Sequence, residues 1–88
     1  MAVASDKLYR RYLENRIAFL RNPRNGREAR VAILTVEEPI LDAYRSRMAK
    51  TVQNIRENKA ILIDRSYRDF LQVESRETVE LSLYKVES

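Results

Sequence analysis

The chain has 88 residues, of which 44% are hydrophobic and 34% are charged, and it contains one glycine and two prolines. This length and composition predict one small folded domain over residues 1 to 88, and they exclude a disordered chain or two domains. Cysteine and histidine are absent, which excludes disulfides, the usual zinc ligands and the commonest general base. We therefore expect no metal, no cofactor and no catalytic activity.

Positive charge is concentrated at the front of the chain. Residues 1 to 30 carry eight Lys or Arg against three Asp or Glu, whereas residues 60 to 88 carry four against six. Arginine supplies 13 of the 17 cations, which favours forked contacts to phosphate or carboxylate. No apolar run is long enough for a signal peptide or a membrane span, so we expect a cytoplasmic protein without a membrane partner.

The first predicted element is an amphipathic helix over residues 5 to 22. Its apolar residues recur at spacings of four, four and three: Tyr9, Leu13, Ile17 and Leu20. Ser5 fits the N-cap position, and Pro23 is expected to end the helix by pushing the preceding residue out of helical geometry. The next step, Asn25 and Gly26, predicts a turn with positive φ.

A buried strand over residues 31 to 36 is predicted after this turn, because the run is β-branched and apolar on both faces. A second helix is expected from Pro39 to about Asn58, with acidic residues at its positive end. Thr35 and Glu38 also fit a capping box, but that earlier start would place the missing amide of Pro39 inside the helix, so the later start is preferred.

The second helix carries a narrow apolar seam. Its members step by three, four, four and three: Leu41, Tyr44, Met48, Val52 and Ile55. We expect this seam to pack on the sheet or to form an interface. The cations of this helix lie off the seam and are interpreted as a solvated face: Arg45, Arg47, Lys50 and Arg56.

The last third is predicted to be mostly strand. Residues 60 to 63 repeat the doubly apolar pattern, and residues 70 to 73 and 79 to 84 are expected to form a hairpin joined through residues 75 to 77. The alternative is a second helix that continues past Asn58. The resulting fold class is α+β, with two amphipathic helices on a sheet of three or four strands.

A loop rich in arginine is the most distinctive local feature. Four arginines spaced by three flank the turn and are interpreted as contacts to phosphate or to an acidic surface, together with the turn itself: Arg21, Arg24, Asn25, Gly26, Arg27 and Arg30. Arg10 and Arg11 are expected to extend this basic patch. The alternative is a solvated loop whose arginines only keep the chain soluble.

Two kinds of binding protein fit these features. We predict a nucleic-acid-binding accessory or regulatory protein that neutralises phosphates with the arginine loop. The alternative is a structural or adaptor subunit that docks through arginines and the seam onto an acidic protein partner, or onto itself as a homo-oligomer. A histidine-free ribonuclease is a remote third interpretation, because Ser66 has no identifiable base and the carboxylates have structural roles.

Overall fold

The structure is a computed structural model that describes residues 1 to 12, 17 to 81 and 84 to 87. Short helices and strands are interspersed along these residues, which confirms the α+β class. The elements are β1 (Ala2–Ala4), α1 (Asp6–Tyr9), η1 (Arg10–Tyr12), β2 (Ile17–Arg21), β3 (Glu28–Thr35), η2 (Pro39–Leu41), α2 (Asp42–Arg47), α3 (Ala49–Arg56), β4 (Leu62–Ile63), α4 (Arg65–Leu71), β5 (Thr78–Leu81) and β6 (Tyr84–Glu87).

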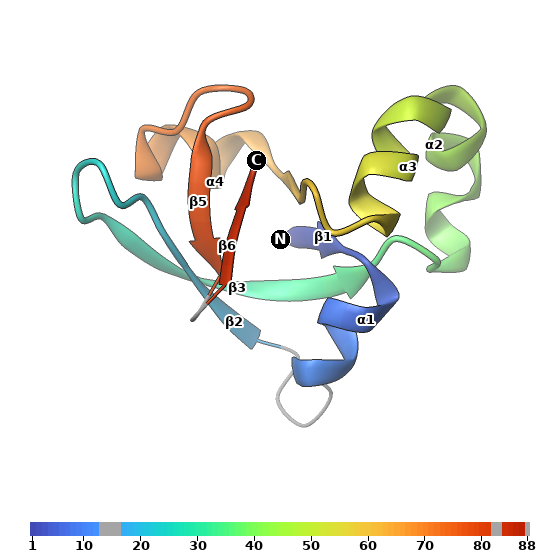
Figure 1. The fold of residues 1–88 in the computed structure, drawn as a ribbon, viewed down its shortest axis with the longest axis horizontal. Coiled ribbons are helices and arrows are strands. Elements are labelled where there is room, and N and C mark those ends of the chain that lie inside the picture. Colours follow the sequence, from blue (N-terminus) through green and yellow to red (C-terminus); the bar gives the residue numbers. More distant parts are fainter. Residues whose placement is uncertain (13–16, 82–83, 88) are drawn as a thin grey trace.

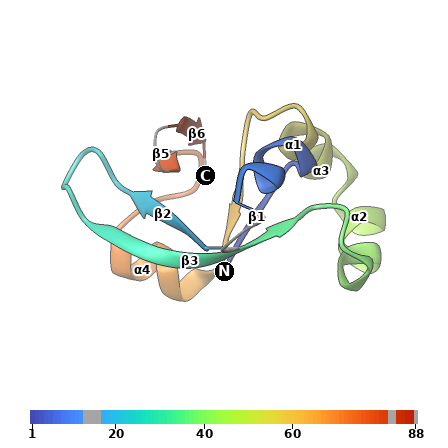
Figure 2. The same cartoon turned by 90° about the horizontal axis from the view of Figure 1, so that it is seen from below.

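The strands form one mixed sheet in the order β4-β1-β3-β2-β5-β6. Only the β1–β3 pair of the described strands is parallel, and the other pairs are antiparallel. Six strands in the described part of the chain exceed the three or four that were predicted. Figures 1 and 2 show β3 running from the β2–β3 turn, at one end of the molecule, toward α2 and α3 at the other.

The two faces of the sheet bury two separate apolar clusters. Ala2 and Ala4 of β1 point into the larger cluster, which α1 and α4 cover, whereas Val3 points to the opposite face. On that second face Val3 packs with Val52 and Ile55, so α3 covers only the β4-β1-β3 side of the sheet. The outer face of β2 stays open, and Ile17 and Phe19 are 41% and 50% exposed.

The first predicted helix is half wrong. It begins as expected, because the Ser5 side chain accepts a hydrogen bond from the backbone N–H of Leu8 at 3.1 Å. Residues 17 to 21, however, form β2 instead of the end of a helix. Leu13, which was predicted to lie on the apolar face of this helix, is outside the described residues.

Pairing across a hairpin explains why residues 17 to 21 are extended. Ile17 to Arg21 pair with Ala32 to Glu28 of β3, and the stretch that was predicted to stop a helix is the six-residue turn between the strands. Ala18 and Leu20 are buried while Ile17 and Phe19 are exposed, which is the period-two alternation of a half-covered strand. Gly26 has the predicted positive φ, at +78°.

The second helix forms where it was predicted, but it is broken at Met48. Pro39 occupies the start of η2, which confirms the later of the two starts, and Met48, with φ −117° and ψ 49°, separates α2 from α3. α3 ends at Arg56, and Asn58 follows it with a φ of +60°. The alternative of a helix running past Asn58 is therefore wrong. None of the described helices is long and apolar enough to cross a membrane.

The hairpin near the C-terminus has different members from those predicted. Residues 65 to 71 form α4, so the predicted strand over residues 70 to 73 is wrong, and the hairpin joins β5 to β6 instead. Tyr67 packs partly against the larger cluster, and a helix that ends at the left-handed residue Gln72 buries both Leu71 and Val73 in it. The predicted strand over residues 60 to 63 is confirmed as β4, although shorter.

Candidate anion-binding cavity

The predicted arginine loop is the β2–β3 turn, and it docks on the end of α4. The last carbonyls of a helix lack partners inside the helix. Here, Asn22 and Asn25 donate through Nδ2 to the carbonyl of Leu71 at 3.0 and 3.1 Å. Arg24 Nη2 donates to the Gln72 carbonyl at 2.8 Å. These side chains therefore form an external C-cap for α4.

The other predicted basic residues also contact neighbours in the chain. Arg27 donates to the Phe70 carbonyl at 3.1 Å and lies over the Phe70 ring, while Arg30 lies 5.8 Å from the centre of the Phe19 ring. Two further arginines form ion pairs: Arg21 with Glu80 at 3.1 Å and Arg10 with Asp6 at 2.7 Å. Arg11 is exposed in η1, which is a different element from the loop between β2 and β3. The loop is thus a structural clasp as well as a basic surface.

The ion pair between Arg24 and Glu77 anchors this turn to the loop before β5. Their Nε and Oε1 atoms are 2.7 Å apart, and Glu77 also accepts from the Glu74 backbone N–H at 2.9 Å. The hydrogen bond from Arg24 is the main reason that the pKa of Glu77 is lowered, and Glu77 in turn raises the pKa of Arg24. A lowered carboxyl pKa stabilises the fold above the ordinary glutamate pKa, and this contribution is lost as the pH falls through the lowered value.

The substitution Arg24→Ala is expected to move the pKa of Glu77 part of the way back to its ordinary value, because the Glu74 N–H remains as a donor. An NMR titration of the side-chain carboxyl carbons measures this shift. The internal control is Glu57, whose pKa is lowered by Gln53 and Lys59, far along the chain from Arg24. A Glu77 pKa that does not move would mean that the ion pair is absent in solution.

Most residues of the predicted interface seam pack against other residues of the same chain. Val52 and Ile55 are buried in the second cluster, and Leu41 and Tyr44 pack against its edge. Met48 is 40% exposed, at the break between α2 and α3. Most of the seam therefore packs on the sheet instead of offering a free apolar surface.

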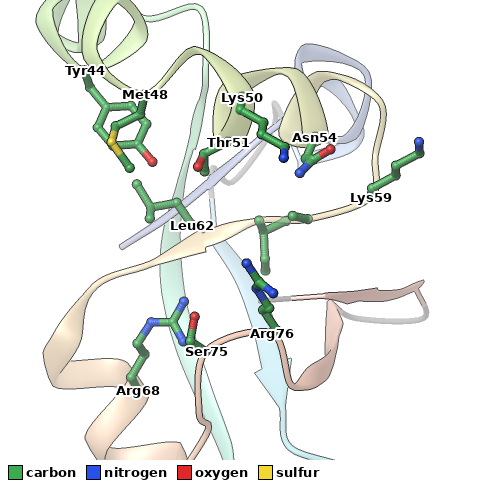
Figure 3. A pocket seen from close by; sticks show the side chains of 12 residues that line it. Tyr44, Met48, Lys50, Thr51, Asn54, Lys59, Leu62, Arg68, Ser75 and Arg76 are labelled. Carbon is green, nitrogen blue, oxygen red and sulfur yellow. The ribbon is translucent and has the colours of Figure 1, made fainter.

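Beside this seam lies a cavity of about 540 Å³. Residues 60 to 62, leading into the edge strand β4, run between two walls: α2 and α3 on one side, and α4 with the loop before β5 on the other (Figure 3). We call this space the basic cavity, after the cationic side chains that line it: Lys50, Lys59, Arg68 and Arg76. Among the residues that the structure describes, no Asp or Glu lines it.

Each of the four cations reaches the basic cavity from a different element. Lys50 lies on α3, Lys59 follows the end of that helix, Arg68 lies on α4 and Arg76 on the loop before β5. Lys59 also pairs with Glu57 at 3.1 Å, outside the lining. Three polar side chains add hydrogen-bonding groups to the lining: Thr51, Asn54 and Ser75. The arrangement favours an anion bearing several acceptor oxygens.

Arg68 and Arg76 have features that packing alone does not account for. Arg68 Nε donates to the Ile63 carbonyl at 3.2 Å, but its Nη1 is buried and has no acceptor within the described part of the chain. A buried donor without a partner is costly in free energy. Arg76 has φ +69°, a conformation that disfavours residues other than glycine and asparagine, and its guanidinium points toward β4 (Figure 3).

The sequence did not reveal this site. Lys50 was interpreted as part of a solvated face, and Lys59, Arg68 and Arg76 were not predicted to bind anything, because they lie far apart in the chain and among acidic residues. Within residues 1 to 12, 17 to 81 and 84 to 87, no cluster of three or more acidic residues could hold a metal ion. No protein-family model matches the chain, and no curated protein or solved structure shows significant similarity to it.

Proposed function

We propose that the protein binds nucleic acid without catalysing a reaction on it, and that the basic cavity holds phosphates of a single strand. The observation that carries this proposal is the charge of the lining, which combines four cations with no described carboxylate. Contacts from Lys and Arg to phosphates supply most of the affinity in binding that does not depend on sequence. This proposal keeps the predicted partner but moves its site from the arginine loop to the cavity.

Two observations favour a single strand over a duplex. The cavity is concave and includes Tyr44 and Met48, beside which an unpaired base can lie. In a duplex the bases are paired and stacked, so only the backbone could reach the cations. The loop arginines are less suited to this role, because Arg24 and Arg27 already donate to carbonyls of their own chain.

A second candidate is the adaptor subunit that docks on an acidic protein. The seam no longer provides its apolar anchor, but the open face of β2 does, since Ile17 and Phe19 are exposed there and Arg30 stacks on Phe19. This face also carries the ion pair between Arg21 and Glu80, so its charge is mixed. The basic cavity is the more uniformly cationic of the two surfaces, which is why nucleic acid is the preferred partner.

A titration of labelled single-stranded and duplex oligonucleotides at several salt concentrations tests the proposal. The double variant Lys50→Ala with Arg76→Asn removes two cavity cations, and asparagine tolerates the positive φ at position 76. We expect single-strand affinity to fall about tenfold or more. The slope of log affinity against log salt should fall by roughly 0.7 for each phosphate that the variant no longer neutralises.

The matched control is the double variant Arg47→Ala with Arg65→Ala, which removes the same charge from exposed positions outside the lining. Its affinity should stay within about threefold of the wild type, since distant exposed charges are screened. Equal weakening in both variants would mean that affinity depends on the net charge of the protein and not on the cavity itself. Absence of binding at low salt contradicts the proposal, and the second candidate would then be examined by pull-down with a Phe19→Asp variant.

A further inference from the structure

The basic cavity has two chemically different ends. Figure 3 shows Tyr44 and Met48 together at one end, against the apolar strand residue Leu62, and Lys50 and Asn54 reaching down from α3 toward the other. A volume of about 540 Å³ lies within the range of pockets for small ligands, so the space suits one compact group better than a long stretch of strand. Its ligand should be anionic at one end and flat or apolar at the other.

The cationic end has more positive charge than one backbone phosphate requires. A phosphodiester carries a single negative charge, whereas a terminal phosphate monoester carries about 1.5 to 2 near pH 7. Lys50, Arg68 and Arg76 have no ion-pair partner among the described residues, and only Lys59 has one, in Glu57. The charge balance therefore favours a phosphate monoester.

Hydrogen bonding leads to the same chemistry. The buried Nη1 of Arg68 needs an acceptor, Ser75 lies beside the Arg68 guanidinium (Figure 3), and Arg76 lines the same cavity. A monoester offers three terminal oxygens, and a diester offers two, so the monoester can serve more of these donors at once. Arg76 has its unfavourable positive φ at the position where its guanidinium faces this end of the cavity.

We propose that the basic cavity binds a single nucleotide that carries a terminal phosphate monoester. Its phosphate lies between Arg68, Arg76 and Lys50, and its base lies against Tyr44 and Met48. Two sources have this chemistry: the phosphorylated end of a strand and a free nucleoside monophosphate. The inference deepens the proposed function and rests on it for the first of these sources.

The test compares three labelled oligonucleotides of one sequence, with a 5′-phosphate, a 3′-phosphate or hydroxyl groups at both ends, and uses adenosine monophosphate as a competitor. One phosphorylated form is expected to bind about tenfold more tightly than the hydroxyl form. The monophosphate should compete for the same site. The variant Arg76→Asn should abolish the preference, while the exposed control Arg47→Ala should keep it.

The outcomes separate this inference from the proposed function. Oligonucleotides that bind equally well whatever their ends overturn the inference and leave the proposed function standing. If the monophosphate binds and none of the oligonucleotides binds, the inference holds for the free nucleotide and the proposed function is overturned. Absence of binding by all probes overturns both. Thermal unfolding of each variant shows whether a missing signal comes from an unfolded protein.

Two additional readouts test the two ends separately. The preference for a phosphorylated end should shrink about fourfold between pH 7.5 and 5.5, because the second pKa of a phosphate monoester is near 6. The chain has no histidine, the side chain that ordinarily changes charge in this interval. The charged and ionisable groups around the cavity are Lys50, Lys59, Arg68, Arg76, Tyr44 and the neighbouring Glu57. At the apolar end, Met48→Ala should weaken adenosine monophosphate but not inorganic phosphate, and equal weakening of both probes would place the base elsewhere.

Discussion

Replacing Leu20 by alanine is expected to lower the free energy of unfolding by about 3–4 kcal/mol. Leu20 is fully buried on β2, opposite Ala29 of β3 on one side and Leu81 of β5 on the other. Strands on both sides limit how far the structure can relax into the space left by the side chain, so the substitution leaves a cavity. Small domains have only about 5–15 kcal/mol of total stability, so a large share would be lost.

Urea unfolding followed by circular dichroism measures this change as a lower midpoint at an unchanged slope. The control is Ile17→Ala on the same strand, where 41% exposure predicts an effect of about 1 kcal/mol or less. This pair also distinguishes the strand from a helix over residues 5 to 22. In such a helix Ile17 and Leu20 would share one buried face, and the two substitutions would have similar effects.

Replacing Asn22 by alanine is expected to lower the free energy of unfolding by about 2–3 kcal/mol. The Asn22 side chain is fully buried, and its Nδ2 donates to the carbonyls of Leu71 at 3.0 Å and Gln72 at 3.4 Å. Its Oδ1 accepts from the backbone N–H of Arg24 at 3.0 Å. Alanine would leave these buried groups without their partner, which is more costly than the loss of an exposed hydrogen bond.

Asn25→Ala is a closely matched control. Asn25 lies in the same turn and donates to the same Leu71 carbonyl, at 3.1 Å, but it is exposed, so water can replace its bonds. The stability of this variant should stay within about 1 kcal/mol of the wild type. Thermal or urea unfolding of the two variants gives the comparison. Equal destabilisation would show that burial of Asn22 does not determine its contribution.

Local sequence patterns predicted the structure correctly wherever neighbouring residues determine the conformation of a segment. The β-branched run within β3, the N-cap at Ser5, the positive φ of Gly26 and the start of η2 at Pro39 all follow from residues that are close neighbours in the chain. Steric limits on φ and short-range hydrogen bonds act over a few residues, so they can be read directly from the sequence.

Residues 17 to 21 and 65 to 73 were misassigned because partners far along the chain decide their structure. Ile17 and Leu20 fit a helical spacing as well as a strand, and pairing with both β3 and β5 favours the strand. Residues 70 to 73 resemble a strand by composition, but the packing of Leu71 under the sheet and the cap provided by Asn22 favour the end of a helix.

By itself the sequence determined the α+β class, the helical region after Pro39, the central β3 strand and the net positive charge of the chain. Only the tertiary structure decided the sheet order, the engagement of the arginine loop with the end of α4, and the basic cavity. Lys50, Lys59, Arg68 and Arg76 lie on four different segments, and their separation along the chain has no regular pattern. They line one cavity because β4 pairs with β1 and thereby places α3 and α4 on either side of the same sheet edge.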